Sequence, residues 1–316
     1  QVETNVARRL KVGKRVELTA GAIEQTGSGV GSRETGVRSR ESGKGRPKAI
    51  QGPPHRLQIS KQSHSPTQQL SLSAIVYADD SLVVVNKPAG LTTMRHKSEA
   101  AEFGERGKKF LPKTLADLLP TLLGQSNRPV VAVHRIDRDT SGLVVFARTR
   151  AAAEALTKQF RKHTVDRRYL ALTRSVPPSG RIESVFVRDR GDGRRGSSRK
   201  PQAVDGKRAV THVKVLTSFG EFALVECRLE TGRTHQVRIH LGEAGTPLCG
   251  ETVYDRPVNG KPVADSSGAS RPMLHAARLG FKHPETGEAM VWEVPPPEDF
   301  ARLEQKLKES ERPDRS

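Results

Sequence analysis

The sequence is short of acidic residues and of cysteines. Among 316 residues there are 54 Lys and Arg but 35 Asp and Glu, so the formal net charge is +19 at pH 7. Such an excess favours a polyanionic partner, most commonly a nucleic acid, and charge for solubility alone is the alternative. The two cysteines, Cys227 and Cys249, lack C-x-x-C spacing. They argue for a reducing compartment and against a structural zinc site.

Long apolar runs are missing as well. No stretch approaches the ~20 apolar residues of a membrane span, and the first residues lack the apolar core of a signal peptide. We therefore expect a soluble, cytoplasmic protein with no membrane partner. An organellar location stays open because the sequence starts at Gln1 rather than at Met. There is no phosphate-binding glycine loop, dinucleotide motif or histidine cluster with ligand spacing, so we expect no cofactor and no metal.

Composition divides the chain into three parts. Residues 1–69 contain thirteen Lys and Arg against five Glu and almost no aromatic side chain. Such a segment cannot bury enough apolar surface to fold, so we predict a disordered basic arm. It either adds nonspecific phosphate affinity or is only a solvated tail. Residues 70–298 have the composition of a folded domain. Residues 299–316 are predicted to be a charged tail with at most one short helix.

Within residues 70–298, apolar residues alternate in the manner of strands and recur in the manner of helices. Hairpins are expected at 75–85, 213–229 and 274–294, further strands at 130–133, 143–147 and 167–172, and helices at 114–123 and 151–163. The segments 188–208 and 258–271 have no apolar period and are expected to be surface loops. The basic residues of 188–208 would suit phosphate contact, or the loop is simply solvated.

A polar loop, His134 to Gly142, lies between two of the expected strands. A loop fixed at both ends by a sheet is a rigid place to hold a reactive group. Asp137 is our candidate for that group, and Asp139 is a local competitor.

Six motifs in order resemble RluA-type pseudouridine synthases. They are Asn86-Lys87-Pro88-Ala89-Gly90, His134-Arg135-Ile136-Asp137 with Thr140-Ser141-Gly142, Arg167-Arg168-Tyr169, Thr231 to Leu241, Gly245 to Tyr254, and Leu274-His275-Ala276. The chain departs from the family at Thr92 to His96, where a valine-histidine-proline step is usual, and it has no recognisable S4 module. The resemblance implies an α+β fold in which helices and loops flank a central, mostly antiparallel mixed sheet.

The resemblance also implies roles for single residues. Asp137 would be the catalytic carboxylate, and Arg233 the cation that pairs with it and keeps it ionised. The alternative for Arg233 is a structural partner or solvent. Tyr169 would stack on the target base, although a tyrosine on a strand is commonly plain core. The residues expected to contact RNA or the base are His134, Arg135, Thr140, Arg238 and Leu274.

The function implied is isomerisation of uridine to pseudouridine in RNA. The reaction needs no cofactor, and Asp137 would act either as a nucleophile or as a base. Ribosomal RNA of the large subunit is the expected partner, with transfer RNA second, and the protein is expected to be a monomer. The alternative is a basic RNA-binding or ribosome-assembly protein that keeps the fold without the activity.

Overall fold

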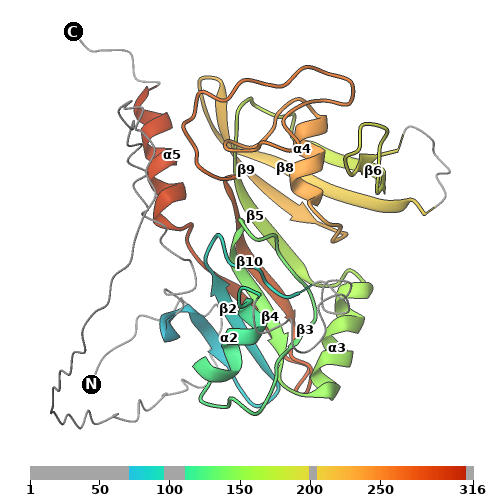
Figure 1. Cartoon of the computed structure of the whole chain (residues 1–316), viewed down its shortest axis with the longest axis vertical. Coiled ribbons are helices and arrows are strands. Elements are labelled where there is room, and N and C mark those ends of the chain that lie inside the picture. The colour runs from blue at the N-terminus through green and yellow to red at the C-terminus, as the bar shows by residue number, and fades with distance from the viewer. Residues whose placement is uncertain (1–70, 96–110, 199–204, 311–316) are drawn as a thin grey trace, which may run out of the picture. The chain divides into compact units, whose positions relative to one another are not determined.

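The structure is a computed structural model that describes residues 71–95, 111–198 and 205–310 (Figure 1). The predicted basic arm, the end of the predicted tail and part of the predicted loop 188–208 lie outside these residues. None of the helices in the described segments is long and apolar enough to cross a membrane.

One mixed sheet contains the eleven strands of the described residues. They are β1 (Ile75–Ala78), β2 (Leu82–Lys87), β3 (Val131–Ala132), β4 (Ser141–Ala147), β5 (Asp166–Thr173), β6 (Gly180–Val187), β7 (Gly196–Ser197), β8 (Lys207–Phe219), β9 (Phe222–Leu229), β10 (Leu274–Lys282) and β11 (Ala289–Glu293). The order across the sheet is β1-β2-β4-β10-β5-β9-β8-β6-β7, with β11 paired to β10 and β3 to β4. Among the strands of the described residues, only β4 and β10 pair in parallel. The predicted α+β fold with a mostly antiparallel sheet is confirmed.

Four α-helices accompany the sheet in the described residues. They are α2 (Leu115–Leu122), α3 (Arg150–Arg161), α4 (Gln236–Glu243) and α5 (Glu298–Ser310), and a short 3-10 helix, η2 (Leu72–Ala74), precedes β1. The helix starts follow ordinary capping chemistry. The Thr149 hydroxyl accepts a hydrogen bond from the Ala152 amide at 3.1 Å, and Thr114 and Asp117 form a capping box at α2.

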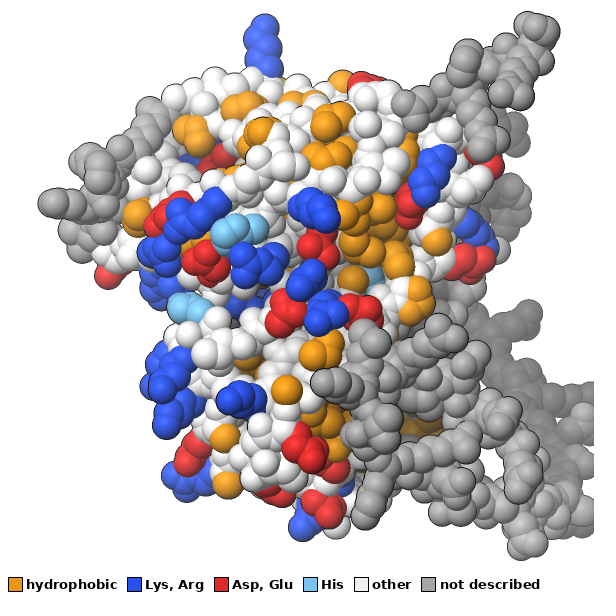
Figure 2. Space-filling view, turned by 180° about the vertical axis from the view of Figure 1, so that it is seen from behind, with side chains coloured by type: hydrophobic (Ala, Val, Ile, Leu, Met, Phe, Trp, Pro, Cys, Tyr) orange, Lys and Arg blue, Asp and Glu red, His pale blue; other side chains and the backbone are white. Residues whose placement is uncertain are grey.

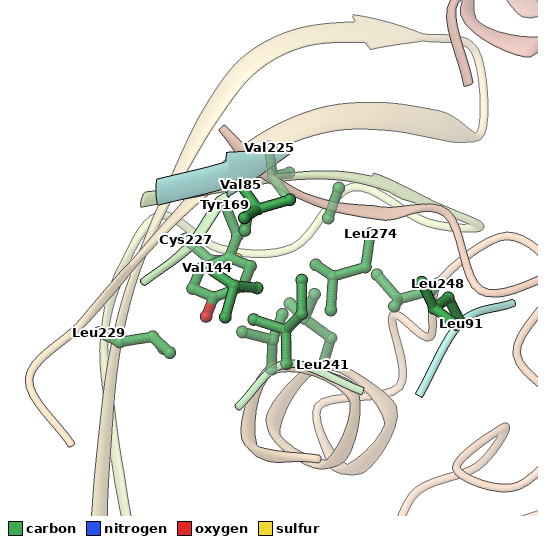
Figure 3. Packing of buried hydrophobic residues seen from close by; sticks show 14 of the residues in the cluster. Val85, Leu91, Val144, Tyr169, Val225, Cys227, Leu229, Leu241, Leu248 and Leu274 are labelled. Carbon is green, nitrogen blue, oxygen red and sulfur yellow. The ribbon is translucent and has the colours of Figure 1, made fainter. Parts of the chain in front are cut away.

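The apolar run of β2 is buried because both faces of the sheet are covered. Leu82 and Val84 belong to a cluster that includes Leu156 of α3. Val83 and Val85 point to the opposite face and join the largest cluster, with residues of α2 and α4 (Figure 3). Side chains alternate across a strand, so a strand apolar at every position must be covered on both sides.

The expected hairpins and helices are confirmed as β1–β2, β8–β9, β10–β11, α2 and α3. Four strands differ from the prediction. Strand β8 begins at Lys207 rather than at 213, and β7 lies within the segment that was expected to be a surface loop. The strand expected at 130–133 is only Val131–Ala132, and Val131 is 45% exposed. Strand β6 was not predicted, because exposed and half-buried residues mix along it without a clear apolar period.

The C-terminal segment also differs from the prediction. A charged tail with at most one short helix was expected from residue 299, and α5 fills most of it as a helix of 13 residues, Glu298–Ser310. Its Phe300, Leu303 and Leu307 are buried in a cluster with Leu172 of β5 and Phe222 of β9. The charged residues form the outer face of a helix that packs on the sheet.

Candidate active site

A cleft of about 450 Å³ lies between the β3–β4 loop, α3, β5, the turn before α4 and the start of β10. Seven of the eight predicted site residues line it, namely Asp137, Arg233, Tyr169, His134, Arg135, Thr140 and Leu274. The eighth, Arg238, does not line the cleft but contacts Asp137. The structure therefore brings together side chains that lie up to 140 residues apart in the sequence.

Lys87 holds the loop that carries Asp137 through hydrogen bonds. This side chain is fully buried, and its ammonium group donates hydrogen bonds to the carbonyl oxygens of Pro88, Leu91 and Arg138 at 2.9, 2.8 and 2.9 Å. The Thr93 hydroxyl donates to the Ile136 carbonyl at 2.8 Å. Both neighbours of Asp137 are thus anchored. Burial lowers the pKa of Lys87 to about 7, and the charges of Asp139 and Asp137 oppose that shift.

Glycine is required where this loop enters β4. Gly142 has φ +111°, and a Cβ atom there would lie 2.3 Å from the Ala276 carbonyl oxygen. Here β4 runs parallel to β10, with Gly142 opposite Ala276. This close approach brings Leu274, two residues earlier in β10, to the cleft.

The cation beside Asp137 is Arg238. Its Nη1 lies 3.7 Å from Oδ2 of Asp137, whereas Oδ1 faces Nε2 of His235 at 3.8 Å. Among the described residues Arg233 forms no ion pair with Asp137, and its Nε donates to the Arg208 carbonyl at 2.8 Å. The predicted Asp137–Arg233 pair is therefore wrong. Arg233 does line the cleft.

Arg238 is fixed from behind by Glu251, whose side chain is fully buried. Nε and Nη2 of Arg238 donate to Oε2 and Oε1 of Glu251 at 2.6 and 2.8 Å. Burial alone would lower the pKa of Arg238, but the hydrogen bonds and charge of Glu251 and the charge of Asp137 outweigh it and raise the pKa. The guanidinium is therefore a permanent positive charge. A bidentate pair of this kind also fixes its orientation.

His235 sits in a left-handed conformation, with φ +58°. Burial lowers its pKa, and Arg238 adds to this effect while Asp137 opposes it. Its Nδ1 forms a 2.9 Å hydrogen bond with the Tyr254 hydroxyl. If that hydroxyl donates, the ring carries its proton on Nε2, facing Asp137. Because burial favours the neutral form of His235, Arg238 is the cation that stabilises the carboxylate.

Tyr169 lies in β5 with only 8% of its surface exposed. Its ring packs beside Val144 and Cys227, and its hydroxyl oxygen points towards Leu229, at the edge of the cluster (Figure 3). The hydroxyl has no hydrogen-bond partner among the described residues. Burial raises the pKa of Tyr169, the charge of Asp137 raises it further, and Arg167 opposes both. The ring of Tyr169 thus belongs to the hydrophobic core and also lines the cleft. Its stacking on a base stays a prediction.

The turn between β9 and α4 is organised by a buried amide. Oε1 of Gln236 accepts hydrogen bonds from the Arg233 amide and the Thr231 hydroxyl at 3.0 and 2.7 Å. Its Nε2 donates to the Val210 carbonyl at 2.9 Å. The turn that presents Arg233 and His235 is therefore tied to β8.

Gly232 lies in this turn and leaves room for a neighbouring side chain. Its φ is not left-handed, and the residue in this turn that takes that conformation is His235. A Cβ at Gly232 would lie 2.5 Å from Nη1 of Arg167, a cleft-lining side chain that is 7% exposed. The glycine leaves room for that guanidinium.

His134 anchors the loop, and Arg135 faces outward. The His134 ring stacks on Phe160, with centroids 4.5 Å apart, and its Nε2 accepts a hydrogen bond from the Val145 amide at 3.0 Å. Burial lowers its pKa to about 3, aided by Arg167. Arg135 is exposed at the cleft and makes no ion pair with a described residue. The predicted RNA contacts of both residues stay predictions.

Three residues of the site were not predicted as functional. Glu251, Tyr254 and His235 lie inside motifs quoted above, but their spacing did not indicate that they support Arg238 and Asp137. One signal was present. A glutamate and a tyrosine in an otherwise small and apolar segment, Gly245 to Tyr254, need partners if they are buried. Among the described residues no group of His, Cys, Asp and Glu could hold a metal ion.

Comparison with known proteins identifies relatives of this arrangement. A family model described as RNA pseudouridylate synthase matches residues 81–243. The ribosomal large subunit pseudouridine synthase D of Neisseria meningitidis serogroup A is 42% identical over 238 residues. That match covers 72% of this chain but 59% of the relative. The protein of the same name from Zymomonas mobilis is 37% identical over 253 residues, which is 78% of this chain and 76% of the relative.

A solved structure is also similar. Human RNA Pseudouridylate Synthase Domain Containing 4 matches with a TM-score of 0.58 and 25% identity, over 74% of this chain and 93% of that chain. The sheet described above is therefore the fold of a known group of proteins.

Proposed function

Because the chain belongs to the RNA pseudouridylate synthase family, we propose that it isomerises uridine to pseudouridine in RNA. One observation carries the proposal: Asp137 and Tyr169 line one cleft, and Arg238 pairs with Asp137. This intact set favours an enzyme over an inactive RNA-binding protein. The names of the Neisseria and Zymomonas relatives support large-subunit ribosomal RNA as the substrate. Transfer RNA is the second candidate.

The reaction breaks the bond between C1′ and N1, turns the uracil, and joins C1′ to C5. No atom is gained or lost, so the protein has to supply one reactive group and a place to hold the detached base. Asp137 is that group, acting either as a nucleophile at carbon or as a base on a sugar proton. Arg238 stabilises its negative charge by Coulomb attraction at 3.7 Å.

The base is held by the apolar walls of the cleft. Tyr169 offers a flat ring and Leu274 an aliphatic side chain next to it. A uridine in folded RNA must first leave its stack, which costs a few kcal/mol. Stacking on an aromatic ring returns about 1–3 kcal/mol per base. We assign to Arg135, which is exposed at the cleft, a contact with the displaced nucleotide or its phosphate.

Mapping of pseudouridine tests the proposal. Purified protein is incubated with unmodified large-subunit ribosomal RNA and, separately, with unmodified transfer RNA, both transcribed in vitro. We expect pseudouridine at defined positions of the ribosomal RNA. Modification of transfer RNA alone would overturn the substrate assignment, and the absence of pseudouridine from both RNAs would overturn the proposed activity.

A further inference from the structure

A second hollow of about 330 Å³ adjoins the cleft. It is lined by Phe186, Arg188, Arg195, Asp205, Lys207, Gly232, Arg233 and Thr234. Three of these, Gly232, Arg233 and Thr234, also line the cleft. A polymer strand that places one nucleotide beside Asp137 can therefore extend into this hollow, which we call the basic pocket.

The basic pocket has unbalanced charge. Arg188, Arg195, Lys207 and Arg233 line it together with one carboxylate, Asp205. None of the four cations forms an ion pair with an Asp or Glu of the described residues. Nearby arginines outside the pocket do form ion pairs: Arg208 pairs with Glu183, and Arg181 pairs with Glu183 and Glu230.

Cations gathered without counter-charges repel one another, and a bound anion relieves that repulsion. Arginine and lysine near one another also match the acceptor oxygens of a phosphate, which arginine binds in a bidentate manner. Figure 2 shows Lys and Arg side chains gathered along its left edge, on the side of the molecule where β6 and α3 lie.

The pocket is built on a fixed support. Between β6 and β7, the guanidinium of Arg190 is fully buried and pairs with Glu243 of α4 at 3.0 Å and with Asp192 at 2.9 Å. The same Glu243 accepts a hydrogen bond from the Ser197 amide at 2.9 Å. The segment that carries Arg188 and Arg195 is thus tied to the helix that also carries Arg238. Preorganised donors lose less entropy when they bind.

We propose that the basic pocket binds a backbone phosphate of the RNA strand next to the target uridine. The proposal rests on the proposed function for the identity of the strand. RNA carries one phosphate per nucleotide, so a uridine in the cleft brings phosphates to both sides of it. Arg233, at the boundary between the two hollows, contacts the strand between base and phosphate. This replaces the role at Asp137 that the sequence had suggested for it.

Two sets of substitutions, which change the charge of the pocket in opposite directions, test the proposal. Arg188→Gln combined with Lys207→Gln removes two positive charges, and Asp205→Asn removes the negative one. Asp205 has φ +64°, a conformation that asparagine accepts, so this change is compatible with the backbone. Lys214→Gln is the matched control, because Lys214 is exposed on the same strand as Lys207 and lines neither hollow.

The probe is in vitro transcribed, unmodified large-subunit ribosomal RNA, and the dissociation constant is measured over a series of salt concentrations. For the double variant we expect binding about tenfold weaker and a salt slope reduced by about 0.7 for each lost contact to single-stranded RNA. Asp205→Asn should bind more tightly than the wild type. The control Lys214→Gln should leave the affinity, the salt slope and the rate at saturating RNA unchanged.

The proposal is wrong if the double variant has the affinity and salt slope of the wild type. It is also wrong if the double variant and Asp205→Asn change the affinity for RNA in the same direction. Equal thermal unfolding midpoints for all four proteins establish that folding is intact. A different measurement tests the proposed function. If the wild-type protein forms no pseudouridine, the proposed activity is wrong, but the affinities of the variants still show whether the basic pocket binds RNA.

Discussion

At the scale of single residues, the sequence indicated Asp137 but assigned its partner wrongly. Arg233 and Arg238 lie five residues apart in one motif, and nothing in their spacing decides which faces the loop from β3. The left-handed conformation of His235 precedes α4, and in the resulting helix it is Arg238 that contacts Asp137. Glu251 then comes from a later segment to hold Arg238. Long-range arrangement of this kind leaves no local pattern.

Arg238→Gln removes the positive charge beside Asp137. By comparison with the loss of one preorganised charge-stabilising donor, we expect kcat to fall by about 10²–10³-fold. Arg233→Gln should mainly raise KM. Single-turnover and steady-state rates on the same RNA separate the two.

The single change leaves Glu251 buried without its partner, which destabilises a protein by about 3–5 kcal/mol. Arg238→Gln with Glu251→Gln therefore serves as the control, since it should regain stability but not activity. Full activity in the double variant would show that Arg238 acts only through folding.

At the scale of elements, the sequence predicted most hairpins and helices because their apolar periods are regular. The sequence was less informative where a charged residue is buried or where charged residues outnumber the apolar ones of a helix. Lys87 is a lysine inside the core, and charged residues are rarely fully buried unless paired. The helix α5 was expected only as a short helix in a charged tail, because charged residues outnumber Phe300, Leu303 and Leu307, although these three follow a helical spacing.

Lys87→Met keeps the length of the side chain and removes its three donors. The carbonyl groups of Pro88, Leu91 and Arg138 would then lack partners, and each buried, unpaired group costs about 1–3 kcal/mol. We expect stability to fall by about 3 kcal/mol or more in urea unfolding, and kcat to fall because Arg138 adjoins Asp137. A variant as stable and as active as the wild type would show that the loop does not depend on Lys87.

Phe300→Ala tests whether α5 is part of the folded domain. Phe300 is 0% exposed, and truncation of a buried phenylalanine costs about 3–5 kcal/mol. Arg302→Ala, on the exposed face of the same helix, should change stability by less than about 0.5 kcal/mol. Equal free energies of unfolding for the two variants would mean that residues 298–310 do not contribute to the core.

At the scale of the whole molecule, the sequence predicted the class of sheet but not its strand order. Strand β10 lies between β4 and β5, more than a hundred residues earlier, and so brings Leu274 to the loop of Asp137 and to Tyr169. Apolar alternation fixes which face of a strand is buried, and it carries no information on which distant strand is its neighbour. The net charge of +19 predicted a polyanionic partner, and the geometry adds where one of its phosphates can bind.

Buried histidines make stability depend on pH. Burial lowers the pKa of His134 to about 3 and that of His240 and His275 to about 4, from an ordinary value of 6.5. Below pH 6.5 the unfolded chain binds protons that the folded chain does not, so stability falls as the pH decreases towards 4. Each histidine should cost about 2 kcal/mol between pH 6.5 and 5. Urea unfolding at pH 7 and pH 5 checks this, and equal stability at both would contradict it.

The most direct measurement compares the protein with its Asp137→Asn variant on the same unmodified large-subunit ribosomal RNA. The substitution keeps the shape of the side chain and removes the charge that faces Arg238. We predict that the variant binds the RNA with an affinity close to that of the wild type and forms no pseudouridine. Pseudouridine formation by the variant at the wild-type rate would contradict the account.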